Sequence, residues 1–91
     1  MQFTWSEAKA ARNKARHRVA FEEAQTCFYD PFQVAFYDPD HSEREDREIL
    51  IAHSNRGRLL LVSYTLRGST VRIISARKTT RIEAEIYAQG I

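Results

Sequence analysis

The chain has 91 residues, enough for one small domain and too few for a substrate cleft between two domains. Apolar residues make up 43% and charged residues 29%, the profile of a soluble globular protein and not of a disordered one. No apolar run approaches the ~20 residues of a membrane-spanning helix, and the first residues lack the layout of a signal peptide. We therefore expect a cytoplasmic protein without a membrane partner.

The net charge of +2 is unevenly distributed along the chain. Residues 1–37 carry +1, residues 38–48 carry −4 and residues 49–91 carry +5. The last part contains seven basic residues, six of them arginine: Arg56, Arg58, Arg67, Arg72, Arg77, Lys78 and Arg81. Because arginine offers phosphate a planar fork of donors, this part is either an anion-binding surface or a solvated basic face.

Two helices are predicted at the start of the chain. Ser6 can cap the first, over about residues 6–17, which is rich in alanine. The second is shorter and places Phe21, Ala24 and Phe28 on one stripe. It ends at Asp30, because the residue before a proline avoids the helical region.

Four strands and a last helix follow. The strands are residues 32–37, 49–53, 59–65 and 70–76, and the acidic connector 38–48 joins the first two. Short turns containing glycine join the others, so an antiparallel meander is predicted. Thr80 and Glu83 fit a capping box for a helix that can end at Gly90. Helices packed on one face of this sheet give a two-layer α+β fold in a single domain, residues 1–91, with the other face available.

Three arginines of the hairpin are candidate phosphate ligands. Arg58 opens the third strand and Arg77 closes the fourth, so the hairpin brings both toward one phosphate, with Arg72 further along. Strict alternation of side chains along the fourth strand predicts that Arg72 points to one face of the sheet and Ser75 to the other. The alternative for Arg58 and Arg77 is that they are edge charges that keep the sheet soluble, or that they pair with the acidic connector. The alternative for Arg72 is an ordinary strand residue that faces solvent.

Several segments together resemble one family. They are residues 3–9, 13–17, 19–24, 56–62, 72–77 and 80–83. The most specific is Arg72-Ile73-Ile74-Ser75-Ala76-Arg77 followed by a basic helix start. In order and spacing these segments are similar to the BrnT family of bacterial type II toxins, over nearly the whole chain.

This resemblance implies a fold related to the RelE-like ribonuclease toxins, RNA cleavage that inhibits translation, and no cofactor. It also implies neutralisation by a BrnA-type antitoxin in a 2:2 heterotetramer, which contacts operator DNA only through the antitoxin. One position departs from the family. Members commonly read Lys-His-Gly at the end of the first helix, where this chain has Arg16-His17-Arg18, so a glycine suited to ending that helix is missing.

Cleavage of RNA without a metal requires groups that move protons and cations that hold the phosphate. His17 is the candidate acid or base, or else an ordinary helix-end residue, and Lys14 either neutralises phosphate beside it or is a surface lysine. Trp5 and Tyr64 either stack on RNA or pack in the protein, and Arg81 is a further RNA-binding candidate. We therefore predict His17, Arg58, Arg72 and Arg77 as the catalytic set.

Other chemistry has little support in the sequence. The single cysteine, Cys27, cannot form an internal disulfide and is interpreted as a small buried residue. Asp38, Asp40 and His41 are the one group near metal-ligand spacing, and we interpret them as loop residues with no metal. Two alternatives to an active ribonuclease stay open: a binding module that cleaves nothing, and a degenerate toxin without activity.

Overall fold

A computed structural model, which describes residues 1–41 and 45–90, has the predicted α+β fold. The α-helices are α1 (Glu7–His17), α2 (Phe21–Thr26) and α3 (Arg81–Gln89), with short 3-10 turns η1 (Cys27–Tyr29) and η2 (Pro39–His41). The strands are β1 (Gln2–Thr4), β2 (Val34–Asp38), β3 (Arg47–His53), β4 (Leu59–Arg67) and β5 (Thr70–Lys78). Within these residues, no helix combines the length and apolarity needed to cross a bilayer.

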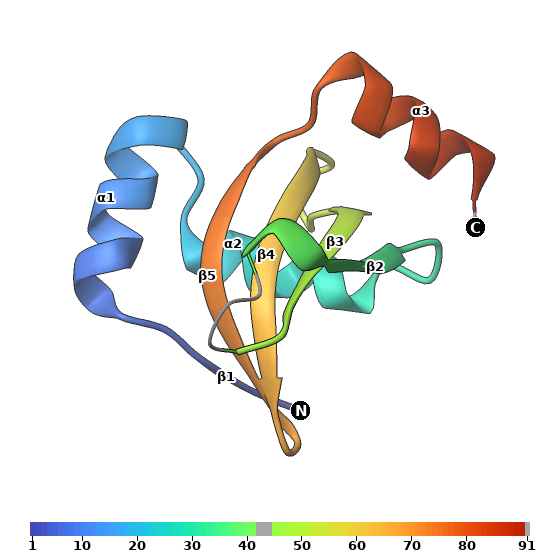
Figure 1. Ribbon diagram of the computed structural model, residues 1–91. Coiled ribbons are helices and arrows are strands. Elements are labelled where there is room, and N and C mark those ends of the chain that lie inside the picture. The colour runs from blue at the N-terminus through green and yellow to red at the C-terminus, as the bar shows by residue number, and fades with distance from the viewer. Residues whose placement is uncertain (42–44, 91) are drawn as a thin grey trace.

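The strands form one sheet in the order β1-β5-β4-β3-β2. The four strands from β2 to β5 pair as the predicted antiparallel meander. The fifth strand was not predicted: β1 lies alongside β5 (Figure 1) and pairs with it in parallel. Gln2 lies opposite Thr70, and Thr4 lies opposite Arg72. A segment of three residues is too short to show an alternating pattern, so its strand character comes from the edge that β5 offers.

A β-bulge breaks the alternation that we expected in β5. Tyr64 of β4 lies opposite Ile73, and the preceding Ser63 lies opposite Ser75, so Ile74 is an extra residue. Residues beyond it change face: Ala76 is fully buried in the core, and Ser75 shares the opposite face with Arg72. The prediction that Arg72 and Ser75 point to different faces is therefore wrong.

The core lies between the sheet and the segment that includes α2. Phe21, Ala24 and Cys27 are fully buried there against strand residues such as Leu60 and Val62. Of the stripe predicted for the second helix, Phe21 and Ala24 are buried in the core and Phe28 packs against it partly buried; the structure divides this helix into α2 and η1. Burial of such side chains is the main stabilising contribution, at about 25 cal/mol per Å² of apolar surface.

One buried amide fixes α1 beside the sheet. Beyond β1, the edge of β5 has no strand partner among the described residues, and Asn13 of α1 takes that place. Its Nδ2 donates to the carbonyl oxygen of Ala76 at 2.9 Å, and its Oδ1 accepts from the Ala76 amide at 3.0 Å. Nδ2 also donates to the carbonyl oxygen of Val19 at 2.9 Å. The α1 helix is thereby held alongside β5, and the backbone amide and carbonyl of Ala76 at the edge of β5 have hydrogen-bond partners.

The end of α1 keeps the geometry that glycine would favour. Arg18 caps the helix with φ 59° and ψ 34°, in the left-handed region, and its amide donates to the carbonyl of Lys14. An L-residue in this conformation costs about 1–2 kcal/mol. The guanidinium of Arg58 donates to the Arg18 carbonyl at 3.1 Å, which holds the turn in place. The substitution of arginine for the family's glycine therefore leaves a left-handed cap.

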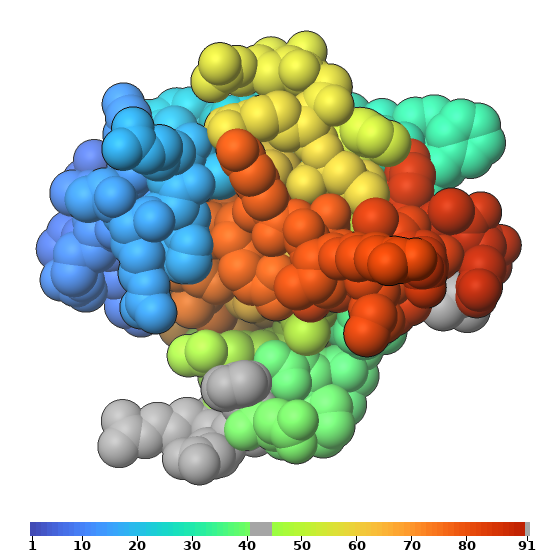
Figure 2. All heavy atoms as spheres, turned by 90° about the horizontal axis from the view of Figure 1, so that it is seen from above, coloured from blue at the N-terminus to red at the C-terminus, as the bar shows by residue number. Residues whose placement is uncertain are grey.

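The third helix lies on the other face of the sheet, which differs from our expectation that all helices share one face. Ile82 and Ile86 of α3 border the same groove as Ile49 and Leu61, strand residues that alternate with the core. Seen from above, α1 (blue) and α3 (red) lie on opposite sides of the molecule with the end of β5 (orange) between them (Figure 2). The predicted capping box of Thr80 and Glu83 is present at the start of α3.

Candidate nucleic-acid interface

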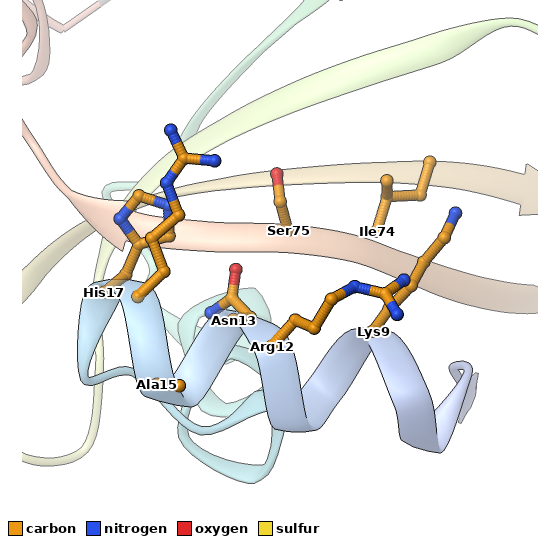
Figure 3. A pocket seen from close by; sticks show the side chains of 8 residues that line it. Lys9, Arg12, Asn13, Ala15, His17, Ile74 and Ser75 are labelled. Carbon is orange, nitrogen blue, oxygen red and sulfur yellow. The ribbon is translucent and has the colours of Figure 1, made fainter.

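A groove of about 570 Å³ runs between α1 and β5, and we call it the α1 groove. The side chains of Lys9 and His17 rise from α1 on the side where Ile74 and Ser75 project from β5 (Figure 3). The residues that line it are Lys9, Arg12, Asn13, Ala15, Arg16, His17, Ile74 and Ser75. Two features form this groove. The bulge turns Ser75 outward, and the Asn13 amide holds α1 beside β5.

The α1 groove is basic and its charges are available to a ligand. Lys9, Arg12 and Arg16 follow the i, i+3, i+7 spacing that places side chains on one helix face. All three are exposed, and neither they nor His17 form an ion pair within the part of the chain that the structure describes. Adjacent unneutralised cations over a hollow create a positive potential that suits a polyanion.

Three of these cations were not among the residues predicted for the site. The prediction followed the density of arginine in residues 49–91, whereas residues 1–37 have a net charge of only +1. The periodic spacing of Lys9, Arg12 and Arg16 was the signal that could have found them. His17, which was predicted, lines the groove, but Lys14 is exposed outside it.

Arg58 and Arg77 do not converge on one phosphate. Arg58 lies on the α2 side, where its guanidinium forms two hydrogen bonds with the carboxylate of Glu23 in α2. The Glu23 side chain is only 6% exposed and also accepts from Ser54 Oγ at 2.7 Å. The hydrogen bond from Arg58 is the main cause that lowers the pKa of Glu23. Arg58 therefore stabilises the packing of α2 against the start of β4.

Arg77 lies on the opposite face, because the bulge turns it outward. Its two terminal nitrogens donate to the two carboxylate oxygens of Glu83 in α3, both at 2.8 Å. It borders a second groove, of about 630 Å³, which we call the α3 groove. Ser75 lines both grooves, so the two hollows adjoin at this residue of β5. Arg77 is close to the α1 groove but already paired.

The remaining predicted arginines are differently placed. Arg72 is half-buried on the outer face of β5, opposite Thr65 of β4. Arg81 begins α3 with a side chain that is 93% exposed and lies 3.6 Å from the carboxylate of Glu85. Arg72 is therefore on the same face as Ser75, whereas Arg81 lines neither groove.

The two aromatic candidates pack against other rings of the protein, Trp5 half-buried and Tyr64 buried. The Trp5 ring contacts Phe21 edge to face at 5.9 Å, and its Nε1 donates to Glu7. Tyr64 is only 5% exposed and packs edge to face against Phe28 at 5.0 Å. Burial is the main cause that raises the pKa of its hydroxyl. The structure corrects the hypothesis that Tyr64 stacks on RNA, since its ring has almost no exposed surface.

Cysteine and metal chemistry have no built site in the described residues. Cys27 is fully buried, and burial raises the pKa of its thiol to about 12, as expected of an inert core residue. No group of three metal-ligating side chains occurs among the described residues. The side chain of His41, part of the group with Asp38 and Asp40, lies outside them.

The profile of the family described as "Ribonuclease toxin, BrnT, of type II toxin-antitoxin system" matches residues 5–83. The chain belongs to the BrnT family. A crystal structure of the Brucella abortus ribonuclease toxin BrnT has the same fold, with a TM-score of 0.65 and 23% sequence identity, over 89% of this chain and 99% of that one. No curated protein matches. By its family, this chain is a ribonuclease toxin of a type II toxin–antitoxin system.

Proposed function

We propose that this chain cleaves single-stranded RNA bound across the α1 groove, without a metal, and so inhibits translation. The observation that carries the proposal is the row of unpaired cations, Lys9, Arg12 and Arg16, which ends at His17 in one groove. Backbone phosphates suit such a row, and the imidazole at its end has a ring nitrogen that can act as a general base.

The proposed reaction is attack of a ribose 2′-oxygen on the adjacent phosphorus atom. His17 accepts the 2′-hydroxyl proton as the 2′-oxygen bonds to phosphorus and the bond from phosphorus to the 5′-oxygen breaks. The departing oxygen takes a proton from water, and the hydroxide that remains takes the proton from His17, which restores the neutral imidazole. The products are a 2′,3′-cyclic phosphate and a 5′-hydroxyl end. Arg12 and Arg16 stabilise the charge on the phosphoryl oxygens. Arg77 joins them when a phosphate replaces Glu83, and Arg72 binds RNA further along β5.

The partner that we propose is a BrnA-type antitoxin in a 2:2 heterotetramer, which binds operator DNA through the antitoxin alone. This follows from membership of a toxin–antitoxin family. We further propose that residues 1–91 act as one toxin domain in the cytoplasm, where its RNA targets are present.

The test is incubation of the purified chain, free of antitoxin, with total bacterial RNA in excess chelator. We expect fragmentation by the wild type, with 2′,3′-cyclic phosphate ends, and at least a hundredfold slower cleavage by His17→Ala. His17→Ala should still bind a 2′-O-methyl oligonucleotide, which cannot be cleaved. Lys14→Ala is the control on the same helix and should cleave normally.

Other outcomes would redirect the assignment. Binding of the oligonucleotide without cleavage by the wild type would favour a module that cleaves nothing, or a degenerate toxin. Cleavage that disappears in chelator would show that the reaction requires a metal. Cleavage that persists in His17→Ala would remove His17 from the proposed chemistry.

A further inference from the structure

A second group of cations lies on the outer face of the sheet, outside the lining of the α1 groove. The strand register places Arg47 of β3 opposite Thr65 of β4, and Thr65 opposite Arg72 of β5. Arg67 follows Thr65 by two residues on β4, so alternation places it on the same face. We call Arg47, Arg67 and Arg72 the sheet arginine cluster.

A carboxylate of the acidic connector already lies among these arginines. Arg67 donates to the two carboxylate oxygens of Glu45, from Nε at 2.6 Å and from Nη2 at 3.0 Å. That hydrogen-bonded pairing is the main cause that lowers the pKa of Glu45, and the positive charges of Arg72 and Arg47 act in the same direction. A carboxylate offers a guanidinium the same pair of oxygens as a phosphate does.

Thr65, in the middle of the cluster, has a buried hydroxyl with unused hydrogen-bonding capacity. The residue is 1% exposed, and its Oγ1 has no partner among the described residues. Valine has the same shape and would avoid this unsatisfied group in the free chain. A hydroxyl between two arginines is a donor suited to an anion that they hold.

The cluster continues the surface of the α1 groove. Arg72 precedes Ser75 by three residues, or about 10 Å of strand, and both lie on the outer face of β5. Ser75 and Ile74 border the α1 groove, with Ile74 near the Lys9 end (Figure 3). A polyanion in the groove that extends past Lys9 along β5 therefore reaches Arg72.

We propose that the sheet arginine cluster is a second RNA phosphate site, occupied in the free chain by the carboxylate of Glu45. The inference rests on the proposed function, since it takes RNA as the occupant. RNA binding then requires a backbone phosphate to displace Glu45, and the connector carboxylate competes with substrate. Glu45 thereby weakens RNA binding without contacting the reacting atoms.

A pair of matched variants tests the proposal. Glu45→Gln removes the competing charge, and Glu85→Gln removes the same charge from another glutamate beside an exposed arginine, Arg81. Binding of a fluorescent 2′-O-methyl oligonucleotide is measured by anisotropy over a range of salt concentrations. We expect Glu45→Gln to bind about fivefold more tightly at 0.1 M salt, with a salt slope steeper by about 0.7, the value of one phosphate contact.

The expected result for Glu85→Gln is an unchanged slope. Equal effects of the two variants would show general electrostatics and would overturn the proposal, as would no effect of Glu45→Gln. Polyglutamate serves as a second probe. If Glu45→Gln strengthens binding of polyglutamate and not of the oligonucleotide, the occupant is an acidic polypeptide and the assignment to RNA fails.

Thr65→Val supplies a second variant that is expected to fold. We predict a melting temperature equal to or above that of the wild type, because no partner of the hydroxyl is lost, together with weaker oligonucleotide binding. Loss of stability with unchanged binding would remove Thr65 from the site. These measurements use an RNA that cannot be cleaved, so failure of cleavage and failure of the second site give separate results.

Discussion

The arginines of α1 and those of the strands differ in what they contact. Arg58, Arg67 and Arg77 each form a two-fold contact with a carboxylate, from Glu23, Glu45 and Glu83 respectively. Arg12 and Arg16 have no such partner within the described residues and border a hollow. The number of arginines in a segment therefore says little about how much positive charge it offers to a ligand.

The largest expected effect is on stability, in Arg58→Ala. Removal of Arg58 leaves the nearly buried Glu23 without its main partner, and we expect a loss of about 3 kcal/mol in the free energy of unfolding. For a chain of this size, that lowers the melting temperature by roughly 15 °C. Urea unfolding at pH 7 measures it.

The matched control is Arg56→Ala. Arg56 lies 3.6 Å from the same carboxylate, but its side chain is 69% exposed. Such a pair contributes less than about 1 kcal/mol. Equal losses in the two variants would show that Arg58 has no special structural role.

The next effect is on RNA binding, in the double variant Arg12→Ala/Arg16→Ala. Loss of two phosphate contacts should weaken binding of an uncleavable oligonucleotide about 25-fold at 0.1 M salt and reduce the salt slope by about 1.4. The melting temperature should stay constant, since neither side chain has a partner in the described structure. Lys14→Ala/Arg81→Ala removes the same charge outside the groove. If it weakens binding equally, the α1 groove is not the RNA site.

A smaller effect is expected on the pH dependence of stability. The hydrogen bond from Arg77 is the main cause that lowers the pKa of Glu83 in the folded chain. This pair is therefore fully stabilising above the ordinary glutamate pKa of about 4.3, and its contribution is lost as the pH falls through the lowered folded value. Melting temperatures from pH 6 to pH 3 should fall less steeply in Glu83→Gln than in the wild type. Parallel curves would contradict the role of the pair.

The smallest effect is expected at the end of α1. Arg18→Gly should raise the free energy of unfolding by about 0.5–1 kcal/mol, because glycine adopts the left-handed conformation without strain and loses part of that gain through its more flexible unfolded state. Arg18→Ala removes the same charge without relieving the backbone and should give no gain. Thermal melts of the three proteins distinguish strain from charge.

Local signals in the sequence predicted the elements that depend on near neighbours. Ser6 and Thr80 cap their helices through contacts three residues away. The β-rich runs and the glycine-containing turns between them predicted the antiparallel meander. The β1 strand could not be predicted in this way, because its three residues depend on an edge almost 70 positions later, at Thr70.

The candidate site was harder to predict, because it depends on contacts distant in sequence. Glu23 and Arg58 are separated by 35 residues, so no local pattern reveals that this arginine is already paired. The bulge at Ile74 changes the face of the sheet on which Arg77 lies, and no distinctive residue type in the sequence predicts a bulge there. His17 was predicted because an imidazole at a helix end is a local feature of the sequence. The spacing of the α1 cations is also local, and it would have predicted them too.

The extra residue in β5 decides which side chains the end of that strand presents on each face. Unbroken alternation that counted Ile74 would place Ser75 and Arg77 in the core and Ala76 on the outer face. Deletion of Ile74 would remove the bulge, and ordinary alternation after Ile73 would keep Ser75 and Arg77 on the outer face. We therefore expect the sheet to accept this deletion, whose main effect would be on the α1 groove that the Ile74 side chain lines.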